Sequence, residues 1–199
     1  MSRRRCYVVY CHPLDDSFAH AALERVLAGL ARRPDVDVRL SDLYADDFSP
    51  EFSLEERRTH KDSPDGKTEI AEYADNLRWC DSLIVVHPTW FSGPPAMLKG
   101  WLDRVLVQGV AWTLPDGASR LKPLLRNIRA ITVVTTHGSS KLINSLQGEA
   151  GKRIWFRSVR VLCHPLTRCR WVAFYGIDRA SDAKRRAFLG RVERAMQRV

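Results

Sequence analysis

The chain has 199 residues, of which 45% are hydrophobic, and it carries a formal net charge of +9. This length and apolar content suit one α/β domain over residues 1–199 with a sizeable core, and they leave too few residues for two. No stretch approaches the ~20 apolar residues of a membrane span, and the basic start is followed by a strand-like run rather than a signal-peptide core. We therefore expect a cytoplasmic protein without membrane insertion.

The basic residues and the cysteines bear on whether the protein binds nucleic acid and whether it contains disulfides. Basic side chains gather at 3–5 and along residues 184–198, where they alternate with apolar residues at helical spacing, so we interpret them as the solvated face of a terminal helix. Nucleic-acid binding is a rival that the net charge alone motivates, because no helix-turn-helix, RNA-recognition or zinc-finger signature is present. The five cysteines lack C-x-x-C spacing, which predicts reduced thiols, mostly in the core.

Apolar runs of strand length alternate with helical patterns along the whole chain. In chain order we expect strand 6–10, helix 18–32, strand 36–40, helix 67–78, strand 82–86, helix 96–106, strand 130–135, a helical stretch around 151–161, strand 170–175 and helix 182–198. Five strands with intervening helices predict a doubly wound parallel sheet, because right-handed crossovers place helices on both faces.

Two long connections interrupt this alternation. Residues 46–66 mix charges with proline and glycine, so we expect them to lie over the surface, where they are a candidate contact for a second subunit. Residues 107–123 contain a short extended pattern followed by Pro115-Asp116-Gly117, which predicts a turn.

The first loop of interest joins strand 6–10 to helix 18–32. Free backbone N–H groups and the positive end of the helix dipole point toward this loop, so it suits an anion such as a phosphate. Ser17 and His12 can add hydrogen bonds. Alternatively, Asp16 or Ser17 is only the helix N-cap and His12 only a turn residue.

The second loop follows strand 82–86 and contains two neighbouring aromatic residues. Pro88 stiffens the exit from the strand, Trp90 and Phe91 supply broad π surfaces, and Gly93 permits unusual backbone angles before two prolines start the next helix. Such a loop can hold a flat ring at the carboxyl edge of the sheet, where open α/β sheets bind ligands. The apolar residues of helix 96–106 recur at helical spacing and are expected to pack in the core.

The third loop, after strand 130–135, reads Thr135-Thr136-His137-Gly138-Ser139-Ser140. Strand parity places it at the same edge of the sheet. Its small residues can expose backbone N–H groups as hydrogen-bond donors. Taken alone it is an ordinary loop.

Together the three loops resemble the flavodoxin-like NAD(P)H dehydrogenase (quinone) family. The second loop matches the family segment P-T/L-x-W/F-x-G-x-P-A-x-L-K-G-W over residues 88–101, the first loop matches at His12, Ser17 and Phe18, and the third matches T-T-x-G. The resemblance implies an α/β flavodoxin-like three-layer α/β/α fold with a five-stranded parallel sheet of order 2-1-3-4-5. It also implies flavin contacts from His12, Ser17, Phe18, Pro88, Thr89, Trp90, Phe91, Thr135, Thr136, His137 and Gly138.

Two departures from the family pattern concern side chains near the flavin. Ala19 stands where many relatives have asparagine, which removes one hydrogen bond. The tyrosine and histidine that assist the quinone in mammalian-type members are unmatched, because Asn144 and Ala150 fall near their places. His137 is a candidate substitute, and its alternative roles are to stabilise the loop or to face solvent. No residue is assigned to acid–base catalysis.

The resemblance implies hydride transfer from NADH or NADPH to the flavin and then to a quinone or similar flat acceptor. FMN is favoured over FAD because the terminal helix lacks an adenine-binding motif, and no G-x-G-x-x-G segment helps to choose between NADH and NADPH. The alternative is a flavin-binding regulatory subunit of a potassium-efflux transporter. Family members are commonly homodimers, for which Trp112 or Trp155 can supply the contact unless they are buried within one subunit.

Overall fold

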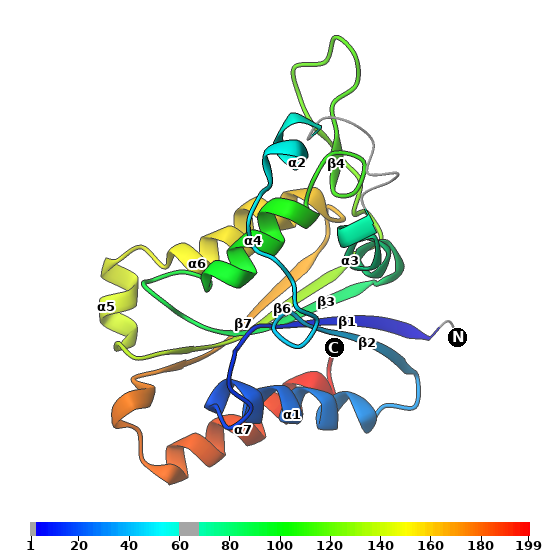
Figure 1. Ribbon diagram of the computed structural model, residues 1–199. Coiled ribbons are helices and arrows are strands. Elements are labelled where there is room, and N and C mark those ends of the chain that lie inside the picture. The colour runs from blue at the N-terminus through cyan, green and yellow to red at the C-terminus, as the bar shows by residue number, and fades with distance from the viewer. Residues whose placement is uncertain (1–2, 60–67) are drawn as a thin grey trace.

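A five-stranded parallel sheet forms the centre of the computed structural model, which describes residues 3–59 and 68–199 (Figure 1). Its strands are β1 (Arg4–Tyr10), β2 (Val36–Asp42), β3 (Ser82–Pro88), β6 (Ala130–His137) and β7 (Arg168–Tyr175). They follow the order β2-β1-β3-β6-β7, which confirms the expected order 2-1-3-4-5. The sheet therefore reverses its winding direction beside β1 and β3, and this is where such sheets bind ligands.

Helices cover both faces of the sheet and give three layers (Figure 1). One face carries α1 (Phe18–Ala31) and α7 (Asp182–Met196), and the other carries α3 (Thr68–Trp79), α4 (Ala96–Val105) and the helical segment of residues 150–162. Every residue of β3 is buried, as its uninterrupted apolar run predicts for a strand covered on both sides. Gly29 lets α1 and α7 approach closely, since a Cβ there would lie 2.5 Å from the Glu193 carbonyl oxygen.

The apolar side of α4 packs in the larger core, as its helical spacing predicts. Leu98, Trp101, Leu102 and Val105 are all buried against β1, β3 and β6. Trp155 is also fully buried in this core. A role for Trp155 in a subunit contact was therefore a wrong expectation, and its alternative placement within one subunit is correct.

Several short elements complete the fold. They are α2 (Leu54–Arg58), β4 (Trp112–Thr113), β5 (Lys122–Pro123), α5 (Lys141–Leu146), α6 (Ala150–Arg153), η1 (Ile154–Val159), η2 (Arg160–Leu162) and η3 (Ile177–Arg179). Those outside the predicted segments 107–123 and 151–161 escape prediction because they are too short to show periodicity. The predicted helical stretch 151–161 is thus a turn of α-helix followed by π-helix and 3₁₀-helix. The expected turn at Gly117 joins β4 to β5, which pair antiparallel.

The connection after β2 is more deeply packed than its polar composition suggests. Phe48 is buried against Tyr73, Pro50 contacts α4 at Gly100, and Glu56 forms an ion pair with Arg104. These contacts anchor a connection that lies over the surface as expected, because Phe48 is the only buried residue among 46–59 and α2 buries none of its residues. Residues 60–66, and residue 67 at the start of the predicted helix, lie outside the described residues.

Two features of the composition have structural counterparts. All five cysteines are free, and four of them are buried while Cys169 is half-buried, so they behave as small core residues. In the part of the chain that the structure describes, no helix combines the length and apolar character needed to cross a membrane.

Candidate functional site

Three loops leave the same edge of the sheet next to one another. Loop 1 (residues 11–17) follows β1, loop 2 (89–95) follows β3, and loop 3 (138–140) follows β6. Because these three strands are parallel and adjacent, their carboxyl ends lie together, at the left of the sheet in Figure 1. The sheet topology thus brings together segments more than a hundred residues apart.

Loop 1 leaves polar groups free at the start of a long helix. Ser17 is the N-cap of α1, and its hydroxyl oxygen accepts the His20 N–H at 3.0 Å, so the hydroxyl can still donate. The Leu14 N–H donates to His12 Nδ1 at 3.0 Å, and the same Nδ1 lies 3.3 Å from the Leu14 carbonyl oxygen, so this local turn occupies Nδ1 and leaves Nε2 available to a ligand. The capping and turn roles are therefore both present, and they orient donors toward the helix N-terminus, where an anion is stabilised.

Phe18 directly follows loop 1 as the first residue of α1, and its ring packs against the smaller core. Its ring packs against Phe174 and Phe188, with centroids 5.7 and 5.9 Å away, in the layer between the sheet, α1 and α7. The resemblance suggested Phe18 as a ligand contact. Because its side chain belongs to this apolar layer, only its backbone can serve that purpose.

Loop 2 is a tight turn that presents an aromatic ring to solvent. Trp90 and Gly93 exchange two backbone hydrogen bonds of 3.0 and 3.1 Å, while Phe91 and Ser92 between them adopt φ values of 44° and 66°. We expected the unusual backbone angles at Gly93. The left-handed angles fall instead on Phe91 and Ser92. A bulky residue at positive φ is rare and costs energy, and such strain concentrates at functional sites. Phe91 is fully exposed, and Trp90 lies 6.1 Å from the His12 ring.

Hydroxyl groups connect loop 2 to β6. The Thr89 Oγ1 lies 3.1 Å from the Thr135 Oγ1 and 3.4 Å from His137 Nε2, and the Thr89 N–H donates to the Thr136 carbonyl at 2.8 Å. Thr135 and Thr136 are buried, whereas Thr89 is half-buried. The two threonines of β6 thus hold the start of loop 2, and Thr89 is the hydroxyl of this group nearest the surface.

His137 is buried and stacks on an aromatic ring. Its ring lies 4.5 Å from that of Tyr175 with 18° between the planes, and Tyr175 in turn donates a hydrogen bond to Glu149. Burial lowers the pKa of His137 below its usual range, so the ring is neutral near pH 7. The solvent-facing alternative is therefore wrong, and the neutral ring positions its neighbours through its stack on Tyr175 and its contact with Thr89.

Loops 2 and 3 enclose a hollow of about 730 Å³, which we call the loop hollow. Four of the predicted site residues line it, namely Thr89, Phe91, His137 and Gly138, together with Ser92, Ser139, Ser140, Ile143, Asn144, Gln147, Gly176, Asp178 and Arg179. His12 and Ser17 belong to loop 1 and do not line the loop hollow, but the His12 ring lies next to Trp90 of loop 2. The predicted residues therefore form two neighbouring groups, one suited to an anion and one to a flat group.

Sequence reasoning missed several residues of the loop hollow that come from α5 and η3. Ser92 donates to the Gln147 Oε1 at 3.0 Å, and Asn144 holds loop 3 through bonds to the Ser139 and Ser140 carbonyls. Asp178 packs so close to Gly138 that a Cβ there would lie 2.6 Å from its carboxylate. The Ser140 N-cap signal could have revealed α5, but nothing local indicates that Asp178 reaches Gly138.

A second buried histidine at the end of β3 makes a pH-dependent contribution to stability. His87 Nδ1 donates to the Pro88 carbonyl at 2.8 Å, and burial lowers the pKa of His87 from 6.5 to about 4. The unfolded imidazole binds a proton below pH 6.5, whereas the folded one does not until about pH 4. The free energy of unfolding therefore falls as the pH drops through this window, by about 3 kcal/mol in total from this group.

Urea unfolding at pH 7 and pH 4.5 checks this expectation. The His87→Gln variant should lose less free energy of unfolding between the two pH values than the unmodified protein, whatever its stability at pH 7. An equal loss in both proteins would contradict the assignment of this pH dependence to His87.

A family model described as flavodoxin-like fold matches residues 4–197. Among curated proteins, NAD(P)H dehydrogenase (quinone) 1 from Rattus norvegicus is 31% identical over 171 residues, which cover 76% of this chain and 60% of the rat protein. The match thus spans less than two thirds of that relative's length.

Solved structures show the same architecture over nearly the whole chain. Smu.1420 from Streptococcus mutans UA159 has a TM-score of 0.85 at 27% identity, covering 98% of this chain and 100% of that one. An NAD(P)H:quinone oxidoreductase from Methanothermobacter marburgensis has a TM-score of 0.78 at 25% identity, covering 98% and 96%. The three-layer arrangement and strand order described above are therefore shared with these proteins.

Proposed function

Because the chain belongs to the family with the flavodoxin-like fold that its residues 4–197 match, we propose that it is a flavin-dependent NAD(P)H oxidoreductase. In this proposal a nicotinamide reduces the bound flavin, which then reduces a quinone or similar flat acceptor. The observation that carries it is the convergence of loops 1, 2 and 3, with an anion-binding helix start beside a hollow rimmed by an exposed aromatic ring. The rat and Methanothermobacter relatives are named as an NAD(P)H dehydrogenase (quinone) and an NAD(P)H:quinone oxidoreductase.

The residues present fit a flavin mononucleotide. The helix N-terminus at Ser17 and the available Nε2 of His12 suit its phosphate, and the loop hollow with Gly138 suits its ring system. When bound, the flavin supplies the hydride acceptance and release that no side chain provides. FMN is the proposed form because these three loops hold groups for a phosphate and a ring.

The chain's own residues would bind, orient and exclude water. Trp90 and Phe91 offer π faces beside the ring, and the Thr89 hydroxyl, held by Thr135 and the neutral His137, offers a hydrogen bond at its edge. His137 acts as a positioning residue in this scheme because Tyr175 stacks on it and keeps it buried. The nicotinamide and the acceptor would stack in turn over the same exposed face.

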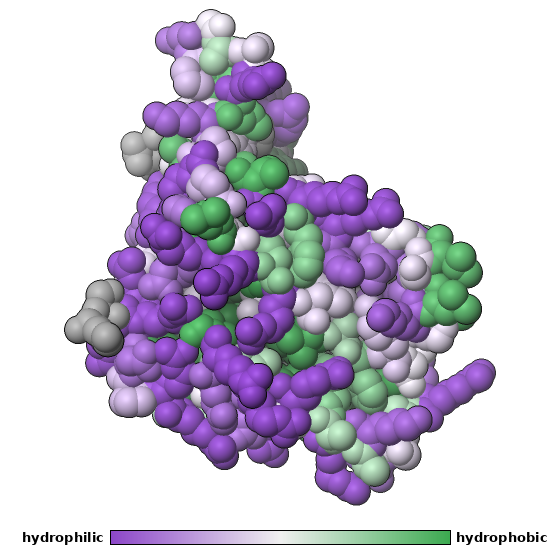
Figure 2. Space-filling view, turned by 180° about the vertical axis from the view of Figure 1, so that it is seen from behind, coloured by the Kyte–Doolittle hydropathy of each residue, from purple (hydrophilic) through white to green (hydrophobic). Residues whose placement is uncertain are grey.

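We also propose a homodimer that covers the mouth of the loop hollow. Leu142, Ile143 and Leu146 of α5 are exposed, as is Phe91 across the hollow. The apolar patch at the right of Figure 2 lies over α5. Exposed apolar surface beside a ligand site favours a contact with another protein surface, and a second copy would also shield the reacting groups from water. Sedimentation of the purified protein should give twice the monomer mass.

The other interpretations receive less support. The rat and Methanothermobacter proteins carry dehydrogenase and oxidoreductase names, which give no support to a transporter-subunit function. Cytoplasmic location of a single domain stays our proposal, favoured by the free cysteines. Our proposal includes both NADH and NADPH as electron donors.

The visible absorption spectrum tests the proposed function. Protein mixed with FMN or with FAD and then desalted should retain the absorption of one of them, and anaerobic NADH or NADPH should bleach it until a benzoquinone restores it. Loss of both flavins on desalting would overturn the proposal. Retained flavin that neither nucleotide bleaches would leave a flavoprotein and refute the oxidoreductase activity.

Replacing Phe91 separates the role of the ring from that of the turn. Glycine adopts positive φ without strain, so Phe91→Gly keeps the turn while removing the π surface. We expect the variant to retain flavin but to show a KM for its acceptor raised about tenfold, the size of one lost aromatic contact. Ser92→Gly is the matched control, since it relieves the neighbouring strained position and keeps the ring. An unchanged KM in Phe91→Gly would contradict stacking on this ring.

A further inference from the structure

The outer edge of the sheet is the side of β7 that no described strand covers. The Arg168 N–H donates to the Arg129 carbonyl next to β6, so the backbone groups of Arg168 and of every second residue after it point inward. The backbone N–H and C=O groups of Trp171, Ala173 and Tyr175 therefore point outward, away from β6. The hydrogen bond that Arg191 of α7 donates to the Ala173 carbonyl at 2.8 Å is consistent with this direction.

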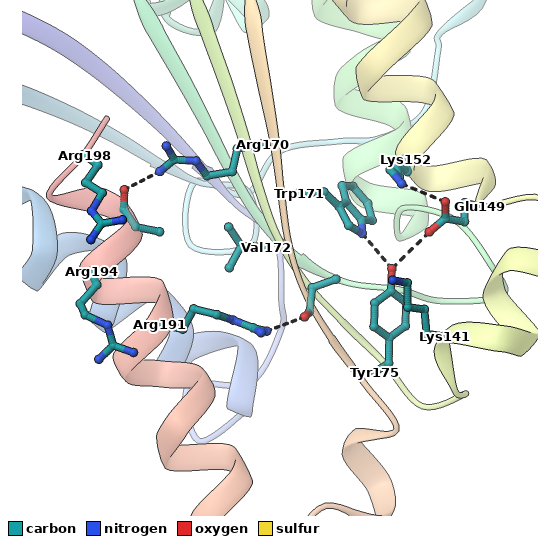
Figure 3. A pocket seen from close by; sticks show the side chains of 12 residues that line it. Lys141, Glu149, Lys152, Arg170, Trp171, Val172, Tyr175, Arg191, Arg194 and Arg198 are labelled. Atoms are coloured by element: carbon teal, nitrogen blue, oxygen red, sulfur yellow. Dashed lines mark hydrogen bonds and ion pairs between the residues drawn. The ribbon is translucent and has the colours of Figure 1, made fainter.

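A groove of about 630 Å³ runs along this edge, and we call it the edge groove (Figure 3). Its lining includes Arg170, Arg191, Arg194, Arg198, Trp171 and Tyr175. The four arginines lie on the α7 side of β7, and the two aromatic residues lie on the other side, near Lys141 and Lys152 (Figure 3). The groove thus has a strongly cationic half and an aromatic half, with the open strand edge between them.

The four arginines of the edge groove have no carboxylate partners. Arg170 and Arg191 donate to the backbone carbonyls of Ala195 and Ala173, and no ion pair joins any of the four to a carboxylate in the described part of the chain. The acidic residue that lines the groove, Glu149, already bonds Lys152 and Tyr175. Four guanidinium groups beside one another repel, so the groove would gain stability from an anionic ligand.

We propose that the edge groove binds an extended acidic segment of a partner protein, which pairs with β7 as a sixth strand. Successive side chains of a strand point to opposite faces, so alternate residues of the segment would meet the arginines and the aromatic half. Acidic residues are required on the first face and apolar ones suit the second. A nucleic acid would satisfy the arginines but has no N–H and C=O ladder to match the outward groups of β7.

Strand addition also explains the hydrogen bond that now covers the edge. A backbone N–H of the incoming segment would replace Arg191 as the donor to the Ala173 carbonyl. The Arg191 guanidinium would then be free to pair with a carboxylate of the same segment. One charge-to-carbonyl bond is exchanged for a backbone bond and an ion pair. The strand edge is thereby protected by Arg191 until the partner arrives.

A labelled peptide of alternating Glu and Val is the probe for this surface. Fluorescence anisotropy should show that it binds more tightly than a peptide with the same residues in two blocks, since only alternation places all carboxylates on one face. Hydrogen exchange should show the amides of Trp171, Ala173 and Tyr175 becoming protected. Equal binding of both peptides, or of an oligo-dT strand, without this protection would overturn strand addition in favour of a general polyanion surface.

Charge reversal on α7 supplies the matched variants. The double variant Arg194→Glu and Arg198→Glu should weaken peptide binding at least about tenfold, as the loss of two exposed charge pairs plus repulsion would. Lys184→Glu with Arg186→Glu makes the same charge change on exposed residues of the same helix outside the groove and should bind the peptide with little change. Both variants should keep the NADH oxidation rate of the flavin-loaded protein, because none of these residues lies in loops 1, 2 or 3. Equal weakening in both would refute the edge groove as the site.

Discussion

Replacing Arg104 by methionine is expected to lower the free energy of unfolding by about 3 kcal/mol, the low end for breaking a buried ion pair from one side. The guanidinium of Arg104 is 2% exposed and donates to Glu56 at 2.6 Å, to Glu69 at 2.5 Å and to the Ser49 carbonyl. It also lies over the Phe48 ring at 5.2 Å. One side chain of α4 therefore joins α3 to the connection that follows β2.

The loss of stability in Arg104→Met arises mainly from Glu56, because the two carboxylate partners of Arg104 differ in their exposure to solvent. Glu56 is mostly covered and would be left with an uncompensated charge, whereas Glu69 is 75% exposed and would be hydrated. Urea unfolding compares the Arg104→Met variant with Glu69→Gln, which removes only the exposed partner and should cost less than about 1 kcal/mol. If the two variants lose the same free energy, Arg104 does not anchor these segments in the way described.

Replacing Gly100 by alanine is expected to destabilise the protein by a similar amount through overlap with backbone atoms. A Cβ at Gly100 would lie 2.3 Å from the Pro50 carbonyl oxygen and 2.4 Å from the Pro50 Cα. Neither atom can move without shifting α4 or the connection after β2, so we expect a loss of about 3 kcal/mol and a Tm lower by about 10 °C.

Gly93 provides the control for this substitution because it belongs to the same sequence segment. A Cβ there meets no atom within 4 Å, and its φ is not in the left-handed region. The Gly93→Ala variant should therefore keep its Tm, and thermal unfolding followed by circular dichroism compares the two. A large loss in Gly93→Ala, or none in Gly100→Ala, would contradict this account of the two glycines.

The strands and long helices could be predicted because their evidence is local. The apolar run at 82–86 reveals β3, and the helical spacing of Leu98, Trp101 and Val105 reveals the buried side of α4. The order of the strands could not be derived in this way, since hydrophobic periodicity says which residues are buried and not which strands are neighbours. The resemblance to a known family supplied that order.

The sequence predicted the three loops of the candidate site, but not how their side chains are arranged relative to one another. Thr89, His137 and Gly138 were named from their motifs, and the structure brings them to the loop hollow. The packing of the Phe18 ring could not be predicted because its partners, Phe174 and Phe188, lie far along the chain. Asp178 was missed for the same reason.

The sequence by itself determined the alternation of strands and helices, the aromatic loop after β3 and the family resemblance, because each depends on residues close together in the chain. Only the tertiary structure decided that His137 stacks on Tyr175, that Gly100 meets Pro50, and that four arginines without a carboxylate partner among the described residues line the open edge of β7. These contacts depend on how parallel crossovers align distant segments, and no local pattern of residues encodes that alignment.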